Sequence, residues 1–96
     1  MEIPYDVRQM IGLFFPGSRD EFSTREEWIA DIVGSFNAVR RENIRKYLDE
    51  LLSGRYSDAE LAEIWRSCGP GHDYSDGGHR FFLAEVRDMI SSPRFR

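Results

Sequence analysis

Apolar residues recur at intervals of three and four through most of the chain, and strict alternation over the length of a strand is hard to find. This spacing is the period of a helix that buries one face, so it predicts an all-α fold. The chain has 96 residues, which is close to the size of one domain with one hydrophobic core. We therefore expect a compact bundle of about five helices that forms a single domain over residues 1–96.

Start and stop signals divide the periodic pattern into helices. The first helix is expected to enter through Pro4 and to stop at the Pro16-Gly17 turn, because proline is tolerated in a helix's first turn and breaks a helix elsewhere. The second should begin at Ser23 or Thr24, since each is followed three residues later by a glutamate, as in a capping box. Asn37 is the expected cap of a third helix.

The fourth helix has the best start signal in the chain, because Ser57 and Glu60 fit a capping box. The run from residue 68 to 71 should end it, and a final helix should follow Gly78 and stop before Pro93 and a short tail. The residues expected to face the core are Tyr5, Val7, Met10, Ile11, Phe14, Trp28, Ile32 or Val33, Phe36, Ile44, Tyr47, Leu48, Leu51, Leu52, Leu61, Ile64, Trp65, Phe82, Val86, Met89 and Ile90.

Composition limits the function. The formal net charge is −4, which argues against a nucleic-acid partner, because phosphate binding requires a basic face. A single cysteine cannot form an internal disulfide, and the first residues lack a basic region followed by an apolar run, so we expect a cytoplasmic protein. No apolar stretch approaches the roughly twenty residues that span a bilayer, so membrane insertion is not expected.

The acidic excess is confined to one part of the chain. Residues 1–37 hold seven acidic residues and three arginines, whereas residues 38–96 hold ten acidic and ten basic residues. A one-sided field of this kind steers oppositely charged partners, so we expect this segment to meet a basic protein surface. Simple solubility is the alternative explanation.

The stretch "CGPGHDYSDGGH" gathers five possible metal ligands, Cys68, His72, Asp73, Asp76 and His79. Their spacing matches no common zinc pattern, because there is no CxxC pair and no HExxH helix. Aspartate and serine among glycines are typical of a tight turn, since their side chains bond to nearby backbone and glycine accepts positive φ. We interpret this stretch as a connection between helices that also offers a contact surface.

Catalytic groups are not expected. Cys68 should lie at a helix C-terminus, where the macrodipole disfavours a thiolate, so it is interpreted as a small buried hydrophobic residue. The carboxylate pairs Asp20-Glu21, Glu26-Glu27 and Asp49-Glu50 are typical of solvated helix faces. We therefore expect no enzyme, no metal and no cofactor.

The order of these segments resembles a known family. "YDVRQMIGLFF", "DEFSTREEWIADIV", "LDELLSGRYSDAELAEIW", a glycine-rich turn and "FFLAEVRDMI" occur in turn, and together they resemble the helical immunity proteins of bacterial contact-dependent growth inhibition systems. The resemblance implies a protein that binds the C-terminal toxin domain of a cognate delivered protein, often a nuclease, and covers its basic cleft. The family's His-Gln-Asp-like run is replaced here by residues 16–20, in which Asp20 is the matching acid.

Charge and expected exposure give the predicted toxin-binding residues, which are Asp20, Glu21, Glu27, Asp31, Asp73, Tyr74 and Asp76. Two other classes stay open. A helical adaptor or homodimerisation module would use the same acidic face or an exposed aromatic patch around Phe14 and Phe15. A small metal-dependent hydrolase would retain stoichiometric zinc through purification.

Overall fold

The computed structural model describes residues 2–70 and 77–95, and these form helices joined by turns. The elements are α1 (Tyr5–Leu13), α2 (Arg25–Gly34), α3 (Ala38–Leu51), α4 (Asp58–Ser67), α5 (Gly78–Ile90) and the short 3-10 helix η1 (Pro93–Phe95). No strand occurs in the two described ranges. The all-α class and the five expected α-helices are confirmed.

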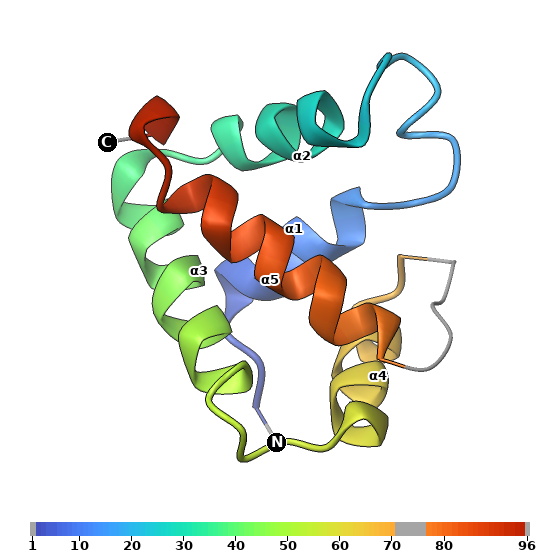
Figure 1. Ribbon diagram of the computed structural model, residues 1–96, viewed down its shortest axis with the longest axis vertical. Coiled ribbons are helices and arrows are strands. Elements are labelled where there is room, and N and C mark those ends of the chain that lie inside the picture. The colour runs from blue at the N-terminus through green and yellow to red at the C-terminus, as the bar shows by residue number, and fades with distance from the viewer. Residues whose placement is uncertain (1, 71–76, 96) are drawn as a thin grey trace.

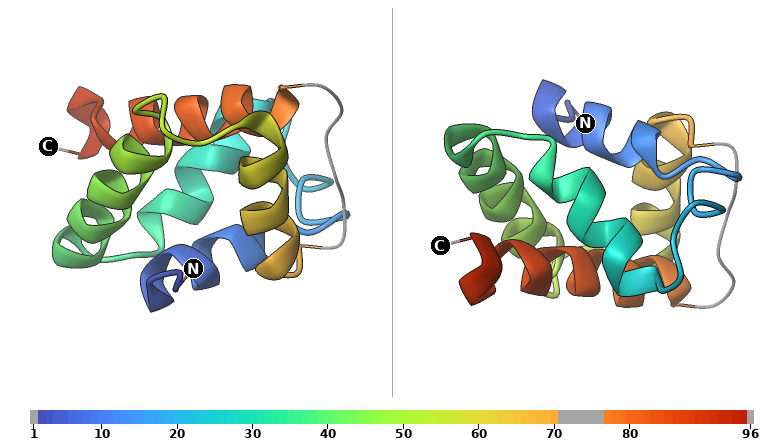
Figure 2. Two further views of the ribbon diagram at one scale, coloured as in Figure 1. Left: turned by 90° about the horizontal axis from the view of Figure 1, so that it is seen from below. Right: turned by 90° about the horizontal axis from the view of Figure 1, so that it is seen from above.

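The helices pack into a compact globule. α5 crosses one side of the molecule and α1 lies on the opposite side, with α2, α3 and α4 around them (Figures 1 and 2). α5 contacts α2, α3 and α4, so it is the central element of the packing. The Cα radius of gyration is 12.5 Å, close to the roughly 13 Å of a compact domain of about 100 residues.

Side-chain caps explain where three helices begin. The Thr24 hydroxyl accepts a hydrogen bond from the Glu27 N–H at 3.1 Å, so of the two possible starts of α2 Thr24 is the cap. The Asn37 side chain accepts from the backbone three residues on at 2.9 Å. Ser57 and Glu60 form the complete capping box predicted for α4. These contacts satisfy backbone donors that have no partner inside the helix.

Four aromatic rings from four segments form the centre of the core. The ring of Phe14, just after α1, packs edge-on against Trp28 of α2 at 5.0 Å and against Phe82 of α5 at 4.9 Å between centroids. Phe82 also meets Trp65 of α4 edge-on at 5.5 Å. Edge-to-face pairs at these distances are favourable beyond the area that they bury. The cluster therefore joins α2, α4 and α5 to the end of α1.

The structure corrects several expected positions. Phe14 is completely buried, as predicted for the core, so the exposed aromatic patch that the adaptor alternative would use is reduced to Phe15. Tyr5, expected in the core, is 69% exposed at the start of α1. Tyr47, Leu52 and Met89 are only partly buried and pack against the edge of the core.

The segment after α5 is not a loose tail over its described part. Residues 93–95 form η1, and the Phe95 ring lies within van der Waals distance of the place where a side chain on Gly34 would project. This contact fastens the C-terminal segment to the end of α2. Among the helices that the structure describes, none combines the length and the hydrophobicity needed to cross a membrane.

Candidate protein-binding surface

The loop between α1 and α2 is folded by a series of tight turns. Gly17 has φ +90°, a conformation that L side chains rarely adopt, so glycine is required there. The Asp20 N–H donates to the Gly17 carbonyl at 3.1 Å, and the Phe22 N–H donates to the Arg19 carbonyl at 3.0 Å. The loop therefore has a defined shape and places its side chains against α2.

Ser18 fastens this loop to α2. Its hydroxyl donates to the Phe15 carbonyl at 2.6 Å and accepts from the Trp28 indole N–H at 3.0 Å. Trp28 is nearly buried, and a buried indole N–H without an acceptor costs free energy. The core and the loop thus share one hydrogen-bond chain.

A hollow of about 410 Å³ lies between this loop and α2, and we call it the loop hollow. Such a volume falls within the range of small ligand sites. The residues that line it are Leu13, Phe15, Gly17, Ser18, Glu21, Phe22, Asp31, Ile32 and Ser35.

The walls of the loop hollow combine apolar surface with carboxylates. Leu13 is 39% and Phe15 49% exposed, although both are large apolar residues. The hydroxyls of Ser18 and Ser35 already donate to backbone carbonyls. The carboxylates of Glu21 and Asp31, by contrast, form no hydrogen bond or ion pair with the side chains of the described residues.

Five carboxylates lie on the loop and on α2, and two of them, Glu21 and Asp31, line the loop hollow. None of them forms an ion pair within the residues that the structure describes; they are Asp20, Glu21, Glu26, Glu27 and Asp31. We call them the unpaired acidic set. Glu26 and Glu27 lie in the first turn of α2, where they favour the helix dipole. Asp31 lies four residues after Glu27, and like charges at this spacing destabilise a helix by roughly 0.2–0.5 kcal/mol.

The structure thus brings together part of the predicted site. Glu21 and Asp31 line the same hollow. Glu27 lies one turn before Asp31 on α2, and Asp20 is exposed in the loop beside Glu21. The other three predicted residues, Asp73, Tyr74 and Asp76, lie outside the described residues.

Sequence reasoning missed the apolar part of the site. Leu13, Phe22 and Ile32 were not predicted to line a contact surface, and Phe15 was paired with the buried Phe14. The two phenylalanines are adjacent just beyond the helix end, where helical periodicity no longer tells which ring is buried. The Pro16-Gly17 turn was the available signal, because it marks where the chain changes direction.

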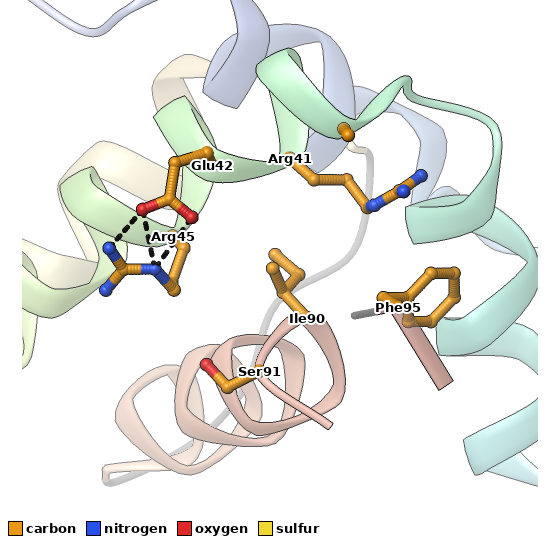
Figure 3. Close-up of a pocket in the computed structure, with 7 residues that line it drawn as sticks. Arg41, Glu42, Arg45, Ile90, Ser91 and Phe95 are labelled. Atoms are coloured by element: carbon orange, nitrogen blue, oxygen red, sulfur yellow. Dashed lines mark hydrogen bonds and ion pairs between the residues drawn. The ribbon is translucent and has the colours of Figure 1, made fainter. Parts of the chain in front are cut away.

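A second hollow, of about 440 Å³, lies between α3, the end of α5 and η1. Figure 3 shows Arg41, Glu42 and Arg45 on one side of it, and Ile90 and Phe95 on the other. Its charges are paired within the molecule. Arg45 bonds to Glu42 and also to Asp49 on the next turn of α3.

The third charged residue of this hollow, Arg41, contacts other parts of the fold. Its guanidinium donates to the Phe36 carbonyl and lies over the Phe95 ring, 5.0 Å from the centroid. The hydrogen bond from Arg45 also holds the pKa of the Glu42 carboxyl below its usual value. The second hollow therefore joins the C-terminal segment to α3, and its one carboxylate, Glu42, has an arginine partner.

A third hollow, of about 480 Å³, lies between α2 and α5, with Glu26, Glu85 and Asp88 among its lining residues. Two of these carboxylates have arginine partners. Arg25 bonds to Glu85 at 2.8 Å, and Arg87 bonds to Asp88 at 3.2 Å. In the third hollow only Glu26 lacks an arginine partner, whereas in the loop hollow both carboxylates lack one among the described residues.

Cys68 and its neighbours in the glycine-rich stretch are the candidates for a nucleophilic thiol or a metal site. Cys68 caps the C-terminus of α4, is partly buried, and has a thiol pKa raised by that burial. A nucleophilic cysteine requires the opposite shift. Within residues 2–70 and 77–95, no three His, Cys, Asp or Glu side chains are placed to hold a metal ion. Three of the five possible ligands, His72, Asp73 and Asp76, lie outside those ranges.

The chain matches no protein-family model, no curated protein and no solved structure.

Proposed function

We propose that this chain is an immunity protein, which binds and neutralises a cognate toxin domain of a contact-dependent growth inhibition system. The observation that carries the proposal is the loop hollow, where partly exposed apolar side chains adjoin two carboxylates that have no ion-pair partner among the described residues. The sequence resemblance supports the same family. The acidic excess of residues 1–37 supports a basic partner.

The proposed mechanism is occlusion. A nuclease toxin holds its substrate in a basic cleft, and Glu21, Glu27 and Asp31 offer carboxylates that compete for that cleft. Phe15 and Leu13 supply apolar area, which such interfaces combine with charge at their energetic centre. An inhibitor of this kind needs no metal or cofactor and performs no chemistry.

The second hypothesis is an acidic adaptor or homodimerisation module. The half-exposed Leu13 and Phe15 favour some partner, and a second copy of the chain is one choice. A symmetric dimer through the loop hollow would bring two copies of the unpaired acidic set together, and facing like charges cost free energy. The charge of this surface therefore suits a basic partner better than a second copy.

The test is co-expression with the toxin domain encoded immediately upstream. We expect a stable equimolar complex that abolishes toxicity. The double charge reversal Glu21→Lys/Asp31→Lys should weaken the complex by about 100-fold, because facing like charges at an interface cost several kcal/mol. The control is Glu63→Lys, an exposed charge on α4 that does not line the loop hollow.

The outcomes separate the hypotheses. A complex that tolerates the double reversal as well as the control reversal places the contact elsewhere. No complex with the wild-type chain, or no such toxin gene, contradicts the immunity proposal. Sedimentation over a range of concentrations then decides whether the chain binds itself.

A further inference from the structure

Arginine is held in the same way at two places in this molecule. Arg25 lies over the Phe82 ring, 4.9 Å from the centroid, and bonds to the Glu85 carboxylate at 2.8 Å. Arg40 lies over the Phe36 ring at 4.7 Å and bonds to Asp6 at 2.7 Å. In each case the guanidinium lies over a phenylalanine ring while a carboxylate contacts one of its nitrogens. Both contacts are favourable for a planar cation.

The loop hollow offers the same two kinds of group without the arginine. Its walls include the rings of Phe15 and Phe22 and the carboxylates of Glu21 and Asp31. Among the described residues, no arginine lies over either ring and none pairs with either carboxylate. Arg94 lines a neighbouring hollow together with Asp31 but forms no ion pair with it.

The shape and polarity of the hollow fit a long cationic side chain. Leu13 and Ile32 add aliphatic surface to the two rings, and arginine carries an apolar stem that packs on such surface while its head group stays at polar atoms. The hydroxyls of Ser18 and Ser35 are already used as donors to the backbone. An arginine head group would therefore meet the carboxylates as its acceptors.

We infer that the loop hollow takes an arginine side chain of the partner protein, whose guanidinium bonds to Glu21 and Asp31 and stacks on the exposed ring of Phe15 while its stem packs on the aliphatic part of the wall. This inference rests on the proposed function in so far as it assigns the arginine to a protein partner. The inference adds that the side chain of the partner in the loop hollow is an arginine. Arginine suits the site better than lysine, because a planar guanidinium both stacks on a ring and bonds to two carboxylate oxygens.

The test uses a small probe, so it does not depend on finding the toxin. N-acetyl-arginine amide is titrated into the ¹⁵N-labelled chain and followed by NMR. N-acetyl-citrulline amide, which has nearly the same shape but no charge, is titrated in parallel. We expect amide shifts at Phe22, Ile32 and Ser35, with citrulline binding at least about fivefold more weakly, since a charged hydrogen bond is about twice as strong as a neutral one.

Two isosteric variants locate the binding site. Glu21→Gln/Asp31→Asn keeps the shape of the walls and should weaken arginine binding by about three- to tenfold. The matched control is Glu50→Gln/Glu63→Gln, which removes two exposed charges from α3 and α4 outside the hollow and should change the affinity less than twofold. Citrulline binding as strong as arginine, shifts spread evenly over the acidic surface, or equal losses in variant and control would each overturn the inference.

The arginine titration can fail or succeed independently of the test of the proposed function. Co-purification with a toxin domain, combined with no probe shifts at the hollow, contradicts the arginine contact and leaves the immunity proposal standing. Probe binding at the hollow without any toxin complex does the reverse. In that case the hollow is an arginine site that serves another protein partner.

Discussion

Two regions of the molecule differ in how many of their carboxylates form ion pairs. On α3, Arg40 bonds to Asp6, and Arg45 bonds to Glu42 and Asp49. On α2 and the loop before it, the unpaired acidic set has no ion pair within the described part of the chain. Glu50 and Glu63 also have no ion pair in this part of the chain, but they lie on different helices, whereas the unpaired acidic set is gathered on the loop and α2. We therefore propose that a partner supplies the cations at this set.

The largest difference is expected between the two neighbouring phenylalanines that follow α1. Phe14 is buried in the aromatic cluster, whereas Phe15 is 49% exposed at the loop hollow. We expect Phe14→Ala to lower the free energy of unfolding by about 3–5 kcal/mol, and Phe15→Ala by less than about 1 kcal/mol. Urea denaturation measures both. Equal losses would show that Phe15 belongs to the core and has no spare surface for a partner.

Removing the hydrogen bond between Ser18 and Trp28 tests whether this bond holds the loop against α2. Ser18→Ala leaves the Trp28 indole N–H without its acceptor, so we expect a loss of about 1–3 kcal/mol in the free energy of unfolding. The control is Ser53→Ala, whose hydroxyl donates only to an exposed carbonyl at 2.7 Å. A loss no larger than that of the control would mean that the loop is held by other contacts.

Single charge removals compare the two sides directly. Asp49→Asn breaks the bond to Arg45 on α3, so it should lower the free energy of unfolding by about 0.3–0.5 kcal/mol. Asp31→Asn removes a like-charge neighbour of Glu27 on α2, so it should leave stability unchanged or raise it by about 0.2–0.5 kcal/mol. Thermal unfolding at low salt measures both. Opposite signs support the comparison, and a loss at Asp31 contradicts it.

The smallest effect is expected in the dependence of stability on pH. The hydrogen bond from Arg40 holds the pKa of the Asp6 carboxyl below its usual value, and Arg45 does the same for Glu42. A lowered pKa in the folded state stabilises the fold above the ordinary carboxyl range near pH 4, and this stabilisation is lost as the pH falls through the lowered value.

Asp6→Asn/Glu42→Gln should therefore flatten the fall of the melting temperature below about pH 4. The control is Glu21→Gln/Asp31→Asn on the other side of the molecule. Identical acid profiles for the wild type and the Asp6/Glu42 variant would remove the assigned role of these pairs.

Much of the fold followed from local signals. The capping residues Thr24, Asn37 and Ser57 each stand before a helical apolar pattern, and each helix begins where they predict. Such contacts reach only three residues along the chain, so the sequence contains them completely. The core positions on α4 and α5 were predictable for the same reason, since one face of each helix carries the apolar residues.

The site was predictable only in part. Glu21 and Asp31 could be found from the local acidic excess, but their meeting at one hollow depends on how the loop folds back on α2. Phe15 is exposed, as the possible aromatic patch required, but its place at the hollow could not be predicted, because it follows a helix end where periodicity gives no direction. The internal pairing of Glu85 with Arg25 joins residues sixty positions apart, so net charge along the chain could not show which acids remain free.

Hydrogen exchange of the chain, free and bound to the toxin domain, tests the central claim most directly. It compares the two sides of the molecule in one measurement. The account predicts that binding slows exchange over residues 13–35, which include the loop hollow and α2, and leaves α3 unchanged. Slower exchange confined to α3 and the C-terminal segment, with the loop and α2 unchanged, would contradict it.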